Sequence, residues 1–367
     1  MRTELPKLIA MARRLLDNGE PGVLATLVSA KGSSYRSLGS MMVGGPPGVI
    51  AGGVSGGCLE EYVVRRGREM TRDRGAVLLS FDTGGADDVD EVKPVLGCGG
   101  SIDVLVERLT DDQLELLRRL AWAYDNDVGT IMTCTIESRG DADAVVVGRQ
   151  WGRPDESDPS AALARLALCD RRGYCGATHG GRRTFVQFVP PLTRLVIFGA
   201  GDDARPVCDL AGSLGWHVTV ADRRARRARA EHFPSADVVV AAPWEEAVGR
   251  IRFTGNTAVV LMTHSLPDDA ILLPLLAGRP LAYAGVLGPA HRRDALLGLV
   301  TEGGLVDENF GARLRGPIGL DLGDRSAAGI AVSVVAEILA HLHERQARPM
   351  SDAPAPPRTA VPVTAHG

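Results

Sequence analysis

The sequence predicts an α/β protein in which an N-terminal mixed α/β domain precedes a doubly wound, Rossmann-like domain with a parallel sheet. Three observations lead to this fold class. Short apolar runs bounded by glycine or charge fill the first half of the chain. After Pro190 and Pro191, strand-like and helix-like segments alternate regularly, as in parallel sheets covered by helices. The 367 residues, 45% of them hydrophobic, are enough to form a core in each of two domains.

The N-terminal half is expected to form a sheet with helices packed on it. A first helix is predicted over residues 5–16, because its apolar residues recur at helical spacing. Strands are predicted at 22–28, 40–45, 48–53, 76–81, 101–107, 129–136 and 143–148, and further helices from Cys58 to Arg72 and at 111–123. The polar segment 150–183 is expected to be a loop between elements.

The C-terminal half is expected to alternate strands and helices. Strands are predicted at 194–198, 217–222, 237–242, 258–262 and 281–288, and helices at 203–214, 223–232, 265–276, 294–302 and 326–344. The last 22 residues contain five prolines and are expected to be a disordered tail. We therefore divide the chain into an N-terminal domain, its extension with a polar loop, a Rossmann-like domain and a tail, over residues 1–110, 111–190, 191–345 and 346–367.

Composition argues against several classes of protein. No apolar run reaches the length of about 18 residues that a membrane span needs, and charges interrupt the segment 1–19 where a signal peptide would be apolar. The net charge of −4 provides no broad basic surface for nucleic acid. Six cysteines without a CxxC pair argue against both a disulfide framework and a structural zinc site. We expect a cytoplasmic protein with neither nucleic acid nor membrane as a partner.

A phosphate-binding turn is predicted at Gly199–Ala200–Gly201, directly after a strand and before a helix. Two glycines let backbone N–H groups approach a diphosphate at a helix N-terminus. Asp222 ends the next strand, where a carboxylate can accept hydrogen bonds from a ribose. NAD(P) is therefore one candidate ligand. Asp202 and Asp203, however, place two carboxylates where the diphosphate would lie, so the unit could also bind something else, or nothing.

The segment 52–60 contains a glycine-rich loop followed by a helix. Ser55, Gly56 and Gly57 are predicted to form a nest of backbone amides that suits an anion. Cys58 is expected in the first helical turn, where the helix dipole favours a thiolate. The loop thus fits an anionic, phosphate-bearing or soft-metal ligand.

A second cysteine, Cys98, lies between glycines and is followed by Gly99, Gly100 and a strand. Glycines at such a position let another molecule approach the backbone closely. We interpret the two loops as one binding site in which Cys58 and Cys98 are the metal ligands. The alternative is that they are two unrelated packing cysteines.

Two further features are weaker candidates. The turn 32–36 contains Ser34 and an arginine that could hold a phosphate or the edge of a ring, or it could be a plain serine-rich turn. His264 follows a strand of the Rossmann-like half and is either an acid–base residue or a hydrogen-bonded structural histidine.

At these motifs the chain resembles a known family, the XdhC/CoxI-type maturation factors of molybdenum hydroxylases such as xanthine dehydrogenase and CO dehydrogenase. The matching segments, in family order, are ATLVSAKGSSYR at 25–36, GGVSGGCLEEYV at 52–63, LGCGGSIDVLVE at 96–107, LVIFGAG at 195–201, LGWHVTVADRR at 214–224, VVLMTHSLPDDAILLPLL at 259–276 and GPIGLDLGDRSAAGIAVSVVAEILA at 316–340. The resemblance implies binding of the molybdenum cofactor (molybdopterin), help with its sulfuration and its transfer to an apo-molybdenum hydroxylase. It also implies a cysteine desulfurase partner, a homodimer and a scaffold with no catalytic residues of its own.

The chain departs from the family pattern at three places. Asp202 replaces a common histidine, residues 288–290 read Gly-Pro-Ala where Gly-Ser-Arg is usual, and Tyr35 replaces a proline. The first two changes affect the Rossmann-like half, so we place cofactor binding mainly in the N-terminal loops. One alternative function is an NAD(P)-dependent oxidoreductase that uses Gly199, Gly201 and Asp222, although no hydride-transfer constellation accompanies them. Another is a regulator or adaptor that no longer binds a cofactor.

Overall fold

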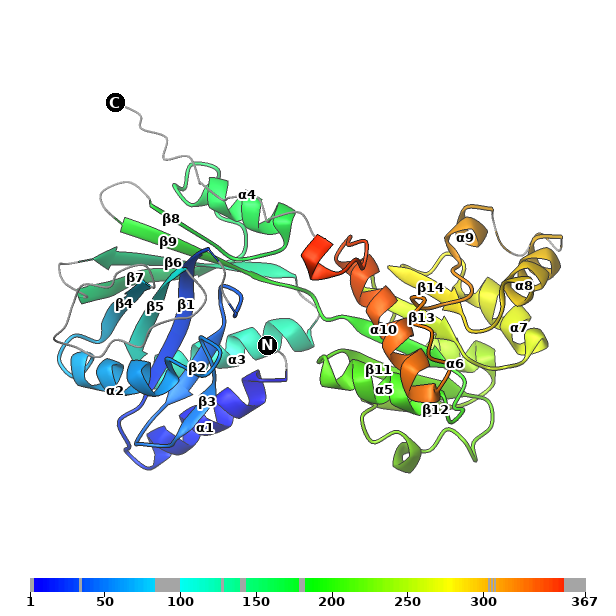
Figure 1. Cartoon of the computed structure of the whole chain (residues 1–367), viewed down its shortest axis with the longest axis horizontal. Coiled ribbons are helices and arrows are strands. Elements are labelled where there is room, and N and C mark those ends of the chain that lie inside the picture. The colour runs from blue at the N-terminus through cyan, green and yellow to red at the C-terminus, as the bar shows by residue number, and fades with distance from the viewer. Residues whose placement is uncertain are drawn as a thin grey trace. The chain divides into compact units, whose positions relative to one another are not determined.

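The computed structural model describes residues 3–352 except 33–34, 83–99, 127–128, 139–142, 178–181, 303, 305 and 307. The chain divides between Pro191 and Leu192 into two compact units. Each unit has its own sheet and hydrophobic cores (Figure 1).

Unit 1 contains a nine-stranded sheet in the order β3-β2-β1-β5-β4-β7-β6-β9-β8, with antiparallel pairing throughout. Its strands are β1 (Val23–Lys31), β2 (Met41–Gly44), β3 (Ile50–Gly52), β4 (Ala76–Asp82), β5 (Ser101–Arg108), β6 (Thr130–Ser138), β7 (Asp143–Trp151), β8 (Tyr174–Ala177) and β9 (Arg182–Val189). Its helices are α1 (Leu5–Asp17), α2 (Glu60–Met70), α3 (Asp111–Asp125) and α4 (Ala161–Asp170).

Strand β1 shows why helices cover both faces of this sheet. Its side chains alternate between two faces, as the pleat requires, and both sets are apolar. Leu24 and Val28 join the core that includes α1 and α3. Val23, Ala25 and Leu27 join the core that includes α2. A strand that is apolar on both sides is stable only when both sides are covered.

The strand register places three loops at one end of the sheet. Lys31 at the end of β1 pairs with Ser101 at the start of β5, and Gly52 at the end of β3 pairs with Met42 near the start of β2. The loop after β1, the glycine-rich loop after β3 and Gly100 before β5 therefore lie at the same end.

The prediction of a loop over 150–183 was wrong. This segment contains α4 and β8, and β9 begins at Arg182. In α4, the side chains of Leu163, Ala164 and Ala167 are buried against Val186 and its neighbours, although polar residues flank the helix. A short apolar stripe within a polar segment is a weak sequence signal, and here tertiary packing stabilises the helix.

Unit 2 is a doubly wound domain, which confirms the predicted fold class. Its parallel sheet has the order β12-β11-β10-β13-β14. The strands are β10 (Arg194–Phe198), β11 (His217–Asp222), β12 (Val238–Ala241), β13 (Thr257–Leu261) and β14 (Tyr283–Val286). The helices are α5 (Ala204–Ser213), α6 (Trp244–Arg250), α7 (Leu266–Leu276), α8 (Ala290–Glu302), α9 (Glu308–Arg313) and α10 (Ala327–Leu342). One core includes α5 and α10, and the other includes α6 to α9.

The expected helix over 223–232 does not form. Arg224 turns back so that its backbone N–H and its guanidinium both donate to the carboxylate of Asp222, and only the short 3-10 helix Ala230–His232 follows. Sequence reasoning also missed α6 and α9. Of the predicted tail, residues 353–367 lie outside the described part of the chain.

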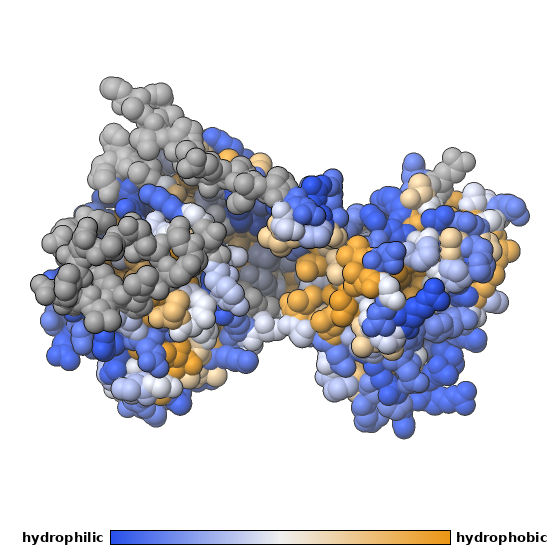
Figure 2. All heavy atoms as spheres, in the orientation of Figure 1, coloured by the Kyte–Doolittle hydropathy of each residue, from blue (hydrophilic) through white to orange (hydrophobic). Residues whose placement is uncertain are grey.

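Helix α10 carries an apolar outer surface in addition to its buried face. Figure 2 shows hydrophobic side chains gathered over this part of unit 2, where Val332 is 48% exposed and Leu339 is 37% exposed. Among the described helices, none has the length and apolar character needed to cross a membrane.

The turn at Gly199 gives a stability test. Gly199 has a φ of +114°, and a Cβ there would overlap the backbone of Met262, so we expect Gly199→Ala to destabilise unit 2 by about 3 kcal/mol. The matched control is Gly249→Ala in α6, where a Cβ meets nothing, and we expect it to stabilise the helix by up to about 1 kcal/mol. Urea unfolding of both variants tests this, and equal stability of the two would contradict it.

Candidate functional site

The glycine-rich loop 53–59 is held by the carboxylate of Glu60, the first residue of α2. Oε1 accepts hydrogen bonds from the backbone N–H groups of Val54 (3.1 Å) and Ser55 (2.8 Å). Oε2 accepts from the Leu59 N–H (3.1 Å) and from the Ser55 hydroxyl (2.6 Å). Since Glu60 is only 8% exposed, four donors on one buried carboxylate fix the path of the loop.

These contacts also set the charge state of Glu60. Burial raises the pKa of the carboxyl group, but the hydrogen bonds from Ser55 and from the backbone outweigh it and lower the pKa below its ordinary value. The carboxylate of Glu60 therefore already accepts the hydrogen bonds of the inward-facing amides in the loop where the sequence predicted a nest. The N–H groups of Gly56 and Cys58 have no acceptor among the described residues, so these two amides can serve a ligand.

Cys58 is exposed at the outer side of this loop. Its thiol donates to the Ser55 hydroxyl oxygen at 3.7 Å, and Ser55 in turn donates to Glu60. The same Ser55 oxygen accepts from the Gly57 N–H at 3.3 Å. Cys58 precedes the first helical residue by two positions, whereas the sequence placed it in the first turn. The thiol thus ends a hydrogen-bond chain that starts at a buried carboxylate.

An exposed aromatic ring lies beside the same loop. Tyr35 is 80% exposed, and a Cβ on Gly56 would contact its ring at 3.5 Å. The next residue, Arg36, forms an ion pair with Glu4 at 2.8 Å. The sequence singled out Tyr35 as a departure from the family pattern within the weak candidate turn 32–36, and neither Tyr35 nor Glu60 was among the predicted site residues. An acidic residue at the first position of a helix after a glycine-rich loop is the signal that could have identified Glu60.

The second cysteine loop is only partly described. Cys98 and Gly99 lie outside the described residues, as does Ser34. Gly100 directly precedes β5, at the same end of the sheet as the loop with Cys58. The part of the chain that the structure describes contains no group of three potential metal ligands. The pairing of Cys58 with Cys98 therefore stays a prediction.

In unit 2, the predicted turn Gly199–Gly201 joins β10 to α5. Strand β10 lies between β11 and β13. The strands β11 and β12 are added on one side of β10, and the later strands β13 and β14 on the other, so the strand order reverses at β10. In doubly wound folds, ligands bind at this topological switch point. The Gly199 N–H donates to the Ala221 carbonyl at 2.8 Å, which ties the turn to β11.

Asp222 is completely buried, and both of its oxygens are occupied. Oδ2 accepts from the Ala200 N–H (2.8 Å) and Arg224 Nη2 (2.6 Å), while Oδ1 accepts from the Arg224 backbone N–H and Nε (both 2.8 Å). Burial opposes ionisation, but the Arg224 and backbone hydrogen bonds hold the pKa below its ordinary value. A ribose would have to displace Arg224, and the cofactor-binding roles of Gly199, Gly201 and Asp222 stay predictions.

His264 and Asp203 form a pair at the same switch point, with 2.7 Å between Nε2 and Oδ2. His264 follows β13 with a φ of +58°, and its side chain is 60% exposed. Because the two residues are 61 positions apart, sequence reasoning noted each of them and missed the pair. The pair can orient an imidazole for proton transfer. Among the described residues, no serine, threonine or cysteine side chain hydrogen-bonds to His264.

Comparison with known proteins agrees with this architecture. Residues 15–82 match the model of the XdhC and CoxI family, and residues 195–338 match that of the XdhC Rossmann domain. A probable xanthine dehydrogenase subunit of Bacillus subtilis (strain 168) is 30% identical over 333 residues, which cover 90% of this chain and 96% of that protein. The chain belongs to the XdhC/CoxI family. The resemblance predicted from the sequence is thereby confirmed.

Two further proteins are similar to this XdhC/CoxI family member. The molybdenum cofactor insertion chaperone PaoD of Escherichia coli (strain K12) is 27% identical over 350 residues, covering 92% of this chain and 89% of PaoD. The crystal structure of a xanthine dehydrogenase from Bacillus halodurans has a TM-score of 0.72 at 24% identity, covering 94% of this chain and 98% of that one. The latter likeness establishes a shared fold.

The lowered pKa of Glu60 predicts a pH-dependent stability of unit 1. We expect Glu60→Gln to be less stable by about 2 kcal/mol at pH 7, because the charged acceptor of four hydrogen bonds is lost. The wild-type advantage is complete above the ordinary pKa of 4.5 and is lost as the pH falls through the lower folded-state pKa.

Urea unfolding between pH 3 and pH 7, spanning that ordinary value of 4.5, measures this difference. Glu61→Gln is the matched control, since Glu61 is the exposed neighbour on the same helical turn. A stability gap between Glu60→Gln and wild type that does not change with pH would contradict the assignment.

Proposed function

We propose that the protein binds the molybdenum cofactor at the loop 53–59 and acts as a maturation factor for a molybdenum hydroxylase of the xanthine dehydrogenase or CO dehydrogenase type. One observation carries the proposal. The Cys58 thiol is exposed and positioned through Ser55 by the buried Glu60, beside two amides that have no acceptor among the described residues. Membership of the XdhC/CoxI family supports the same assignment.

The groups on the loop fit the chemistry of this cargo. A molybdopterin carries a thiophilic metal, a hydrogen-bonding pterin and a phosphate. A cysteine is a soft ligand for such a metal. The amides of Gly56 and Cys58 suit the phosphate or a pterin acceptor, and the exposed ring of Tyr35 provides a flat apolar surface.

Four further residues complete the proposed site. Ser34, Cys98 and Gly99 are assigned to it on sequence grounds, and Cys98 is the second proposed metal ligand. Gly100 supports this grouping because β5 starts at the same end of the sheet as β1 ends.

The names of relatives support the class of client. PaoD is named a molybdenum cofactor insertion chaperone, and the Bacillus subtilis relative is named as part of a probable xanthine dehydrogenase. By this proposal the protein carries the cofactor, presents it for sulfuration by a cysteine desulfurase and transfers it to the apo-hydroxylase. It does so as a homodimer and without a catalytic step of its own.

Retention of the cofactor tests the proposal. The purified full chain is incubated with molybdenum cofactor and gel-filtered, and retained pterin is measured by fluorescence. We expect Cys58→Ser to retain about tenfold less pterin than wild type, because the soft ligand is replaced by a hard one. The matched control is Cys169→Ser, which removes another exposed thiol, near the end of α4 in the same unit.

Two outcomes would contradict the proposal. One is pterin retention that is the same in wild type, Cys58→Ser and Cys169→Ser. The other is retention of NAD or NADP in a parallel incubation with no retention of pterin, which would favour an oxidoreductase that uses the Gly199 turn.

A further inference from the structure

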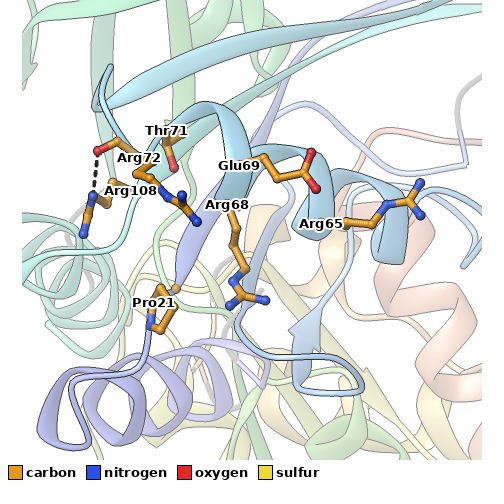
Figure 3. Close-up of a pocket in the computed structure, with 8 residues that line it drawn as sticks. Pro21, Arg65, Arg68, Glu69, Thr71, Arg72 and Arg108 are labelled. Atoms are coloured by element: carbon orange, nitrogen blue, oxygen red, sulfur yellow. Dashed lines mark hydrogen bonds between the residues drawn. The ribbon is translucent and has the colours of Figure 1, made fainter. Parts of the chain in front are cut away.

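The C-terminal end of α2 borders a second polar site in unit 1. A hollow of about 210 Å³, open to solvent, is lined there by Arg65, Arg68, Arg72 and Arg108 together with Glu69, Thr71, Pro21 and Gly22. Figure 3 shows the side chain of Arg68 extending from α2 on the side of Pro21, and Arg72 just beyond the end of the helix.

This hollow is far from the loop with Cys58. Val23, at the start of β1, pairs with Arg108 at the end of β5, whereas the loop with Cys58 lies at the opposite end of the sheet, where β1 ends and β5 starts. Helix α2 connects the two places, and its 11 residues span about 16 Å at 1.5 Å per residue. The arginine site and the cysteine loop are therefore at opposite ends of one helix.

The four arginines of the hollow have no bound counter-charge among the described residues. None of these four arginines forms an ion pair with another residue that the structure describes. The carboxylate of Glu69, which also lines the hollow, pairs instead with Arg66 at 3.6 Å. In addition, Arg68 Nε is buried without a hydrogen-bond partner among the described residues. Unpaired buried donors and clustered like charges are both unfavourable, so an anion that satisfied them would bind favourably.

The local backbone does not oppose such a ligand strongly. The carbonyl end of a helix repels anions, but two carbonyl groups at or just beyond this end are already hydrogen-bonded. The Gly67 oxygen accepts from the Thr71 N–H at 2.9 Å, and the Arg72 oxygen accepts from Arg108 Nη1 at 2.8 Å. The latter bond, drawn in Figure 3, also holds the Arg108 guanidinium at the edge of the hollow.

We infer that this hollow binds the phosphate or diphosphate group of a small molecule. The planar fork of a guanidinium matches two oxygens of a phosphate, and several such forks around one space favour a multiply charged anion over a single carboxylate. The site is separate from the cofactor loop of the proposed function and does not depend on it.

Calorimetric titration of the full chain with inorganic pyrophosphate tests the inference. We expect the double variant Arg68→Gln/Arg72→Gln to bind pyrophosphate at least about tenfold more weakly than wild type, because two charge-assisted contacts are lost. The matched control is Arg118→Gln/Arg119→Gln on α3, which removes the same charge from an exposed surface of the same unit and changes the affinity less than about twofold. Thermal unfolding without ligand verifies that both variants fold, and the single variant Arg72→Gln, at an exposed position, provides a second measurement.

Three results would overturn the inference. The first is no binding of pyrophosphate to wild type at about 1 mM in low salt. The second is an equal loss in the two double variants, which would indicate a non-specific charge effect. The third is tighter binding of a short polyglutamate peptide than of pyrophosphate, which would assign the surface to a protein segment. Cys58→Ser is expected to bind pyrophosphate like wild type, so failure here and failure of the proposed function are distinguishable.

Discussion

Hydrogen bonds from backbone amides to a buried carboxylate hold two glycine-rich loops of this protein in place. In unit 1 the carboxylate is Glu60, which accepts from three amides and a hydroxyl of its loop. In unit 2 it is Asp222, which accepts from the Ala200 amide inside the Gly199 turn. A buried charge with this many donors is costly to move, because breaking any contact leaves it partly unsatisfied. These contacts therefore fix the backbone conformation of each loop.

The same interaction limits what the loops can bind. Amides that point at an internal carboxylate are not available to an external phosphate. In unit 1, Gly56, Cys58 and the thiol stay accessible, so the outer side of the loop is equipped for a ligand. In unit 2, the guanidinium of Arg224 donates to both oxygens of the Asp222 carboxylate, which is the group that would contact a ribose. This contrast supports the proposal that the cofactor binds in unit 1.

Much of the fold could be predicted from the sequence. The central strands β10 and β13 of unit 2 are buried on both faces, so each is a continuous apolar run between turn residues and is recognised easily. Helix α4 and strands β8 and β9 were missed because their apolar stripes are short and lie among polar residues. The helix expected at 223–232 does not form because Arg224 is drawn to Asp222, a contact that helical propensity does not reveal.

The sequence by itself determined the fold class, the family, the Gly199 turn and the glycine-rich loop with Cys58, because these depend on local spacing and on residue types that few structures use in that order. Only the tertiary structure decided how the groups are used. Four features depend on where side chains point and on which neighbours bury them. They are the hydrogen bonds of Glu60 to the amide nest, the ion pair of Arg224 with Asp222, the Asp203–His264 pair and the cluster of arginines around the hollow. Spacing along the chain does not contain that information, since hydrogen bonds and charge balance are settled by distances in space.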